Sequence, residues 1–164
     1  MIGGLQTNKC KPLAEQVANL YCVSSVDTAK KADALEKGRA ALAQQQELET
    51  KLRVLVQVNT SGEESKSGLA PEELPELLAG LAQFVTLRVT GLMTIAMDSD
   101  DEQRVRGCFR TLRELRDRAR EDGPGFVGDG ELSMGMSGDL ELAIAEGATC
   151  VRAGRAIFGQ RPRP

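Results

Sequence analysis

Two turns near the carboxyl terminus hold the groups of this chain that are best suited to binding an anion. The segment 132–159, LSMGMSGDLELAIAEGATCVRAGRAIFG, contains two short apolar runs, and each run is followed by such a turn. The first turn contains Ser137 at a position typical of a helix N-cap, beside free backbone N–H groups. The second contains Gly154, whose missing side chain lets an anion approach the backbone. Both turns therefore suit a phosphate, and the alternative is that Ser137 only caps a helix and Gly154 only forms a turn.

The absence of histidine limits the acid–base and metal chemistry that is open to the chain. Histidine is the commonest general base and metal ligand, so carboxylates, lysines, tyrosine or a bound cofactor must supply any reactivity. The cysteines lie far apart without a CxxC pair, at Cys10, Cys22, Cys108 and Cys150. Their spacing predicts reduced thiols and argues against a zinc site or a redox motif.

The composition is that of one globular domain and disfavours two classes of partner. The chain has 164 residues, a net charge of -3 without a polybasic region, and only 3% aromatic residues, which argues against nucleic acid. The arginines of residues 98–122 alternate with acidic residues and predict a solvated helix face. No run reaches the roughly 18 apolar residues of a membrane span, and the amino terminus does not resemble a signal peptide. We therefore expect a cytoplasmic protein with no membrane partner.

Apolar strand patterns and helical patterns alternate along the chain, which predicts an α/β fold with a parallel sheet covered on both faces. We expect strands at 20–26, 52–60, 85–96, 132–136 and 150–154, with a stub at 1–4. We expect helices at 11–19, at 28–49 after a cap at Asp27, from Pro71 onward, at 98–122, after Ser137 and in RAIFG. A (β/α)8 barrel uses about 250 residues, so 164 residues would hold five or six of its units, and an open sheet is the alternative.

Five motifs in order resemble the pyridoxal phosphate homeostasis protein family, the YggS and PROSC type. They are IGGLQTNKCKPL, VQVNTSGEESKSGL, GLMTIA, LSMGMSGDLELAIAEGA and VRAGRAIFG. The resemblance implies that residues 1–164 form a single partial TIM barrel of the alanine racemase N-terminal type that binds pyridoxal 5'-phosphate (PLP). It also implies a monomeric, non-catalytic protein of intracellular vitamin B6 homeostasis, which buffers PLP or delivers it to PLP-dependent apoenzymes.

The resemblance assigns a role to each of four residues near the carboxyl terminus. It places Ser137, Gly154 and Arg155 at the phosphate and Arg152 at the pyridine nitrogen of PLP. Arg155 departs from the family pattern, which more often has threonine or serine, although its fork of donors suits a phosphate. An arginine beside the pyridine nitrogen keeps that nitrogen unprotonated and weakens the ring as an electron sink, which agrees with a carrier.

The resemblance also points to polar and apolar residues at the ends of other strands. Asn59 and Lys66 match polar residues of a loop at the active face of the barrel, and Met93 matches a strand residue that faces the cofactor. Lys66 is otherwise a solvated loop lysine, and Met93 is otherwise core filling. Gln6 and Asn8 follow the first short strand, where they are either site residues or turn residues.

The lysine that forms the Schiff base in the family lies in a first-strand motif similar to VSKTKP, which this sequence lacks. We therefore expect that the first two βα units are missing, either because the gene model is incomplete or because a partner or a rearrangement covers the gap. None of the lysines lies inside an apolar strand, where burial would lower its pKa; they are Lys9, Lys11, Lys30, Lys31, Lys37, Lys51 and Lys66. The expected binding of PLP is weak and noncovalent.

Two other functions stay open at this point. A PLP-dependent racemase-like enzyme fits the barrel, but racemisation needs two opposed bases, usually a lysine and a tyrosine from a second domain, and the only tyrosine is Tyr21. A degenerate fragment that acts only through protein–protein contacts would use the exposed sheet edge of an opened barrel.

Overall fold

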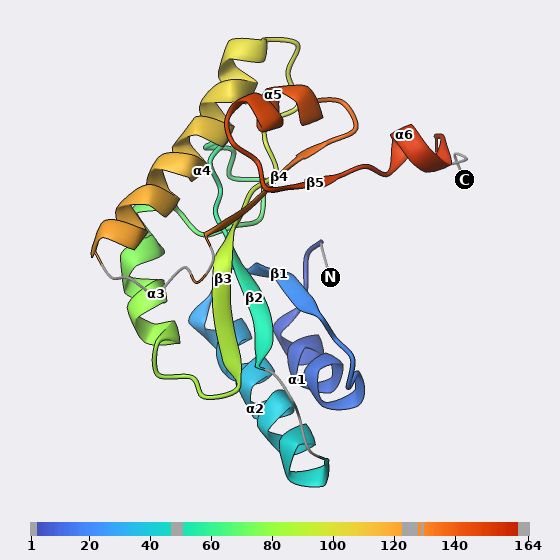
Figure 1. Cartoon of the computed structure of the whole chain (residues 1–164), viewed down its shortest axis with the longest axis vertical. Helices are drawn as coiled ribbons and strands as arrows, with labels where there is room; N and C mark the ends of the chain where they lie inside the picture. The colour runs from blue at the N-terminus through green and yellow to red at the C-terminus, as the bar shows by residue number, and fades with distance from the viewer. Residues whose placement is uncertain (1–2, 47–50, 123–127, 129, 161–164) are drawn as a thin grey trace.

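The computed structural model describes residues 3–46, 51–122, 128 and 130–160 and contains one curved sheet of five parallel strands (Figure 1). The strands are β1 (Cys22–Val26), β2 (Leu52–Gln57), β3 (Leu87–Met93), β4 (Glu131–Met136) and β5 (Cys150–Arg152). Their spatial order is the chain order, β1-β2-β3-β4-β5, whereas a doubly wound sheet reverses its order at a switch point. The expected incomplete (β/α)8 barrel is therefore confirmed over an open sheet of the doubly wound type.

Helices connect the strands. They are α1 (Thr7–Gln16), α2 (Ala29–Gln45), the 3-10 turn η1 (Pro71–Glu73), α3 (Leu74–Leu81), α4 (Glu102–Asp122), α5 (Leu140–Ala145) and α6 (Arg155–Phe158). The core lies between the sheet and these helices and contains Val54, Val56, Leu92, Phe109 and Leu132, all fully buried. Within the described residues, no helix has both the length and the apolar composition needed to cross a membrane.

The inner face of the sheet is more polar than the sequence predicts. Arg53 of β2 and Glu131 of β4 form an ion pair of 2.8 Å across β3. They approach each other over Gly91, which pairs with Glu131 in the sheet register and carries no side chain. The expectation of strands with two apolar faces is therefore wrong here, because alternate residues of each strand face the polar interior of the half-barrel.

The starts of two helices, α2 and α4, differ from the expected ones because side chains before each helix bond to N–H groups of its first turn. Thr28, rather than Asp27, caps α2 by accepting a hydrogen bond from the Lys31 N–H at 3.3 Å. Asp27 instead binds the Lys31 ammonium at 2.8 Å. Helix α4 begins at Glu102 rather than at residue 98, since Asp101 accepts a bond from the Gln103 N–H.

The amino-terminal segment also differs from the expectation. Helix α1 begins at Thr7 and contains Pro12 within it, whereas the sequence pattern predicts a start at residue 11. Gly3 and Gly4 form no strand, and residues 1–2 of the expected stub lie outside the described part of the chain.

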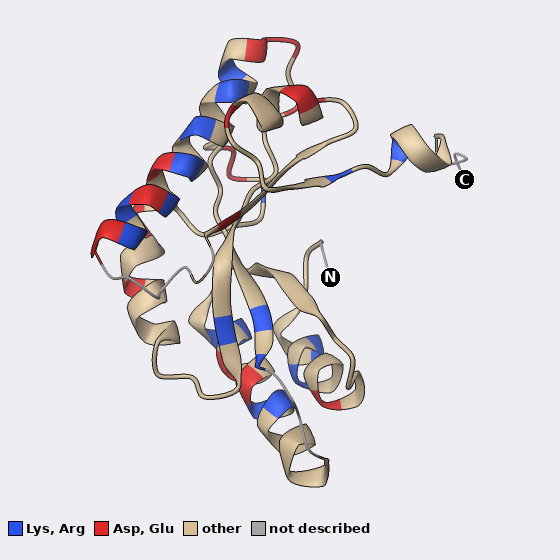
Figure 2. Cartoon of the chain, viewed as in Figure 1, with Lys and Arg blue, Asp and Glu red and all other residues tan. Residues whose placement is uncertain are grey.

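The arginine-rich face of α4 is a docking surface for α5 rather than a purely solvated face (Figure 2). Three guanidinium groups contact the carboxylate of Glu146, the residue after α5: Arg113 at 2.8 Å, Arg106 at 3.0 Å and Arg110 at 3.2 Å. Glu146 is only 3% exposed. The prediction of a solvated face is therefore wrong for Arg106 and Arg113, which are half-buried, whereas Arg110 is exposed as expected. The sequence pattern misses this contact because the common partner is distant in the sequence.

Candidate functional site

The turns after β4 and β5 meet at the carboxyl ends of the strands. The hydroxyl of Ser137 accepts a hydrogen bond of 3.1 Å from the backbone N–H of Ala156, in the first turn of α6. The expected helix N-cap at Ser137 is wrong, because Asp139 occupies the N-cap position of α5. The Asp139 carboxylate accepts a bond from the Met136 N–H instead. Ser137 is thereby released from capping and joins the two turns.

The backbone beside this contact is open. A Cβ placed on Gly154 would meet no heavy atom within 4 Å among the described residues. Arg155, the first residue of α6, is exposed, and its N–H lies in the first helical turn, where no preceding carbonyl is available to accept it. The turn after β5 therefore combines an exposed backbone at Gly154 with an exposed arginine, and the Ser137 hydroxyl contacts the next residue, Ala156.

Arg152 is fixed on the inner face of the sheet. Its guanidinium donates to the Ser133 hydroxyl at 3.0 Å and to the Thr94 carbonyl at 2.8 Å, and so connects β5 with β4 and with the end of β3. Burial lowers the pKa of Arg152. Met93 is fully buried and pairs in the sheet register with both Gln57 and Ser133, which brings it to the same end of the inner face.

Thr94 and Ser133 hold Arg152, and the sequence analysis did not single out either residue. Both are polar and buried, Thr94 directly after β3 and Ser133 within β4, and a polar residue in an apolar strand pattern is the signal that could have found them. Thr94 also bonds the Thr60 hydroxyl at 2.9 Å and donates to the Val58 carbonyl at 2.8 Å. The end of β3 is therefore tied to the segment that follows β2.

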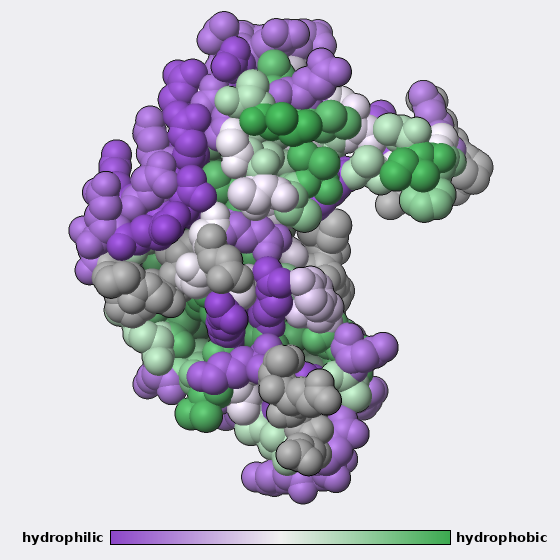
Figure 3. Space-filling model, in the orientation of Figure 1, coloured by the Kyte–Doolittle hydropathy of each residue, from purple (hydrophilic) through white to green (hydrophobic). Residues whose placement is uncertain are grey.

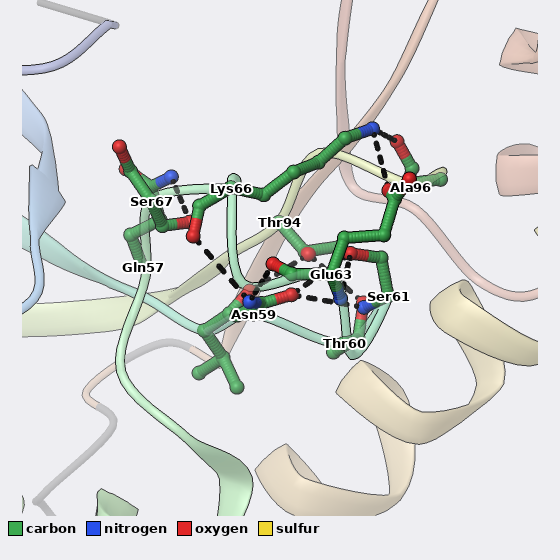
Figure 4. A network of polar contacts seen from close by, with 10 residues as sticks. Gln57, Asn59, Thr60, Ser61, Glu63, Lys66, Ser67, Thr94 and Ala96 are labelled. Atoms are coloured by element: carbon green, nitrogen blue, oxygen red, sulfur yellow. Dashed lines mark hydrogen bonds and ion pairs between the residues drawn. The ribbon is translucent and has the colours of Figure 1, made fainter. Parts of the chain in front are cut away.

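The loop after β2 is ordered by Asn59 (Figure 4). The Asn59 amide donates to the Glu63 carbonyl at 2.9 Å, and its oxygen accepts from the Ser61 N–H at 3.2 Å and from the Ser61 hydroxyl at 2.9 Å. Lys66 reaches across the loop to the Ala96 carbonyl at 2.8 Å and to Glu63 at 3.2 Å. The amide nitrogen and the amide oxygen of Asn59 thus both bond within the loop. The Lys66 ammonium connects the loop to the segment after β3.

The remaining predicted residues lie apart from these contacts. Gln6 precedes α1 and Asn8 belongs to α1, and both are exposed. Among the lysines of the described segments, none lies within a strand. The described residues also contain no group of three or more histidine, cysteine or acidic side chains that could hold a metal ion.

The sequence profile of the alanine racemase N-terminal domain matches residues 4–162. The pyridoxal phosphate homeostasis protein of Schizosaccharomyces pombe is 41% identical, over 98% of this chain and 64% of the relative. The protein of the same name from Pseudomonas aeruginosa is 44% identical, over 98% of this chain and 63% of the relative. The chain thus spans slightly less than two thirds of the length of these curated relatives.

Solved structures agree with the sequence relatives. PipY of Synechococcus elongatus, solved with PLP bound, has a TM-score of 0.81 and 30% identity, over 97% of this chain and 69% of PipY. Alanine racemase from Corynebacterium glutamicum has a TM-score of 0.62 at 18% identity, over 87% of this chain and 36% of the enzyme, which shows a shared fold alone. The chain therefore belongs to the alanine racemase N-terminal domain family and, within it, to the pyridoxal phosphate homeostasis proteins.

Proposed function

We propose that this chain binds PLP at the carboxyl ends of the strands and serves PLP homeostasis without catalysing a reaction. The contact between the Ser137 hydroxyl and the Ala156 N–H carries the proposal, because it brings the turn after β4 to the first turn of α6. The relatives named for PLP homeostasis and PipY, solved with PLP, support the same ligand. In a cell, such a protein buffers PLP in the cytoplasm or passes it, as a monomer, to PLP-dependent apoenzymes.

The residues of the site fit the two ends of the cofactor. Ser137, Gly154 and Arg155 would hold the phosphate with a hydroxyl, exposed backbone and a guanidinium fork. Arg152 lies on the inner face, where its bonds to Ser133 and Thr94 hold a permanent positive charge toward the pyridine nitrogen. PLP supplies a reactive aldehyde on an electron-withdrawing ring, and an arginine at the ring nitrogen would keep that nitrogen unprotonated, which makes the ring a weaker electron sink.

The residues of the neighbouring strand ends have supporting roles in this proposal. Asn59 positions the loop after β2, since its amide is fully used within that loop. Lys66 closes the loop over the strand ends, and Met93 forms an apolar floor beside Ser133. The ammonium of Lys66 is held by a carbonyl and a carboxylate. We therefore propose that PLP binds noncovalently.

Replacing Ser137 by alanine is expected to weaken PLP binding about tenfold, since one hydrogen bond to a charged group is worth roughly 1.5 kcal/mol. Equilibrium dialysis of the full chain against PLP measures the change. Ser65→Ala is the matched control, because Ser65 is an exposed serine of the loop after β2 without a side-chain contact among the described residues. If Ser137→Ala and Ser65→Ala bound PLP with equal affinity, the phosphate of PLP would not contact Ser137. A lysine labelled by PLP after borohydride reduction would contradict the noncovalent mode.

The structure gives a racemase function no support. Tyr21, the only tyrosine, lies before β1 and therefore at the amino ends of the strands, where its hydroxyl contacts Arg53. The proposed PLP site lies at the opposite ends of the strands, so Tyr21 is not placed to act as the second base.

A further inference from the structure

Thr94 is a buried residue whose backbone and side chain both bond to other segments. It directly follows β3 and is fully buried. Its hydroxyl donates its one proton to the Val58 carbonyl at 2.8 Å, so the Thr60 hydroxyl, at 2.9 Å, donates to Thr94 (Figure 4). The Thr94 N–H donates to the Ser133 carbonyl at 3.2 Å, and the Thr94 carbonyl accepts from Arg152 at 2.8 Å. Thr94 therefore connects the segment after β2 with β4 and β5.

The Thr94 carbonyl lies beyond the end of the regular sheet. Met93 is the last residue of β3, and its register pair with Ser133 is the last pair between β3 and β4. Val58 is held in place, because its own N–H donates to the Met93 carbonyl at 2.9 Å. The bond from the Thr94 hydroxyl to Val58 therefore anchors a carbonyl that the sheet itself does not hold.

Arg152 depends on that carbonyl for its orientation. It ends β5, a strand of three residues at the edge of the described sheet. Within the described residues no carboxylate forms an ion pair with Arg152, whereas Glu131 pairs with Arg53 at 2.8 Å. Two neutral acceptors hold the Arg152 guanidinium instead, the Ser133 hydroxyl at 3.0 Å and the Thr94 carbonyl. Because a guanidinium is planar, bonds to both of its terminal nitrogens fix the direction of its Nε–H.

The inner face of the sheet leaves Arg152 accessible to a ligand. Arg152 is half-buried, and among the described residues its Nε donates to no protein group. Figure 3 shows a hollow on the concave side of the molecule, between its body and helix α6, with hydrophilic side chains beside it. One N–H of Arg152 is thus left for a ligand, and its direction depends on Ser133 and Thr94.

We propose that Thr94 is a positioning residue for PLP and that it acts through Arg152. The bond between its hydroxyl and Val58 anchors the Thr94 carbonyl, and this carbonyl holds the plane of the Arg152 guanidinium. The inference rests on the proposed function, which assigns Arg152 to the pyridine nitrogen. It adds that the segment after β2, through Val58 and Thr60, controls an arginine on β5.

Thr94→Val removes the hydroxyl and keeps the branched shape of the side chain. We expect it to weaken PLP binding to the full chain about fivefold in equilibrium dialysis, and Thr94→Ser, which keeps the hydroxyl, to bind within about twofold of the wild type. Thr90→Val is the matched control, since Thr90 is a fully buried threonine of β3 whose hydroxyl has no partner within the described segments. Equal affinity of Thr94→Val and Thr90→Val, or a Thr94→Ser variant as weak as Thr94→Val, would overturn the inference.

The same exchange in combination with Arg152→Met shows whether Thr94 acts through Arg152. If it does, Thr94→Val weakens PLP binding by less than about twofold when Arg152→Met is already present. A further fivefold loss would mean that the two residues act independently, which contradicts the inference and leaves the proposed function intact. A wild-type chain that does not bind PLP would instead contradict the proposed function.

The Nε–H signal of Arg152 in nuclear magnetic resonance spectra of the ligand-free chain tests the positioning without PLP. Thr94→Val is expected to shift this signal, whereas Thr94→Ser and Thr90→Val leave it in place. Thr60→Val removes the bond to the Thr94 hydroxyl and is expected to shift the signal as well, which keeps the test decisive if Thr94→Val does not fold. An Arg152 signal that stays in place in Thr94→Val, or in Thr60→Val where Thr94→Val does not fold, would show that Thr94 does not position Arg152.

Discussion

Exchange of Glu146 for glutamine is expected to lower the free energy of unfolding by about 2 kcal/mol. Removing one partner of a buried ion pair typically costs about 3–5 kcal/mol, and partial exposure of the three arginines reduces this figure. The Glu146 carboxylate is 3% exposed and contacts Arg106, Arg110 and Arg113 at 3.2 Å or less. Glutamine keeps the shape but leaves three cations side by side without a counter-ion.

The same residue predicts a pH dependence. Burial raises the pKa of Glu146, but hydrogen bonds from Arg110 and Arg106, together with the positive charges of Arg110 and Arg113, outweigh burial, so the pKa lies below its usual value of 4.5. A depressed carboxyl pKa stabilises the fold above the unfolded pKa, and this stabilisation is lost as the pH falls through the folded pKa. We therefore expect the difference in stability between wild type and Glu146→Gln to be constant above about pH 5.5 and to shrink below pH 4.5.

Urea unfolding of both proteins between pH 3 and 8 measures this difference. Glu114→Gln is the control, since Glu114 is an exposed carboxylate of α4 without an ion pair among the described residues. A stability loss equal for Glu114→Gln and Glu146→Gln would mean that general charge, rather than the α4–α5 contact, is responsible.

Replacing Gly91 by alanine is expected to destabilise the chain by about 3 kcal/mol or to prevent folding. A Cβ at Gly91 would lie 2.1 Å from the carbonyl oxygen of Glu131 and 2.7 Å from its Cβ. The clash involves the backbone of β4, so β3 and β4 would have to separate, and the ion pair of Glu131 with Arg53 would be lost with them.

Gly107→Ala gives a control of opposite sign. A Cβ at Gly107 would meet nothing within 4 Å among the described residues, and alanine in a helix interior is favoured by about 0.5–1 kcal/mol over glycine. Thermal unfolding followed by circular dichroism is expected to show a lower Tm for Gly91→Ala and an equal or higher Tm for Gly107→Ala. Equal Tm values for the two variants would contradict the packing argument.

The sequence was sufficient to predict the parallel α/β order and the meeting of the two glycine-marked turns. Parallel strands bring their carboxyl ends to one edge, so Ser137 and Gly154 had to lie near each other once the strands were recognised. The partner of Ser137 was not predictable. Ser137 and Asp139 are both residue types that commonly cap helices. Asp139 occupies the N-cap of α5, while Ser137 contacts Ala156, and this distant contact is not visible in the local sequence.

Other features depend on contacts between segments that are distant in the sequence. The bonds of Arg152 depend on a register shift between β4 and β5, which alters which side chains face one another. The counter-ion of the α4 arginines lies more than thirty positions along the chain, at Glu146. The buried Arg39 of α2 donates to the Ala18 carbonyl, and no local pattern connects these two positions.

Strand β5 and helix α6 form a carboxyl-terminal arm that extends from the edge of the sheet (Figure 1). Strand β5 is three residues long, and in α6 Ile157 is 68% exposed and Phe158 is 86% exposed. Little apolar burial holds this arm, so its amides are expected to exchange with deuterium before those of β2 and β3. A ligand that contacts both Ser137 and the start of α6 would link the arm to the turn after β4 and slow the exchange of its amides. The exchange rate of the arm would then report ligand occupancy.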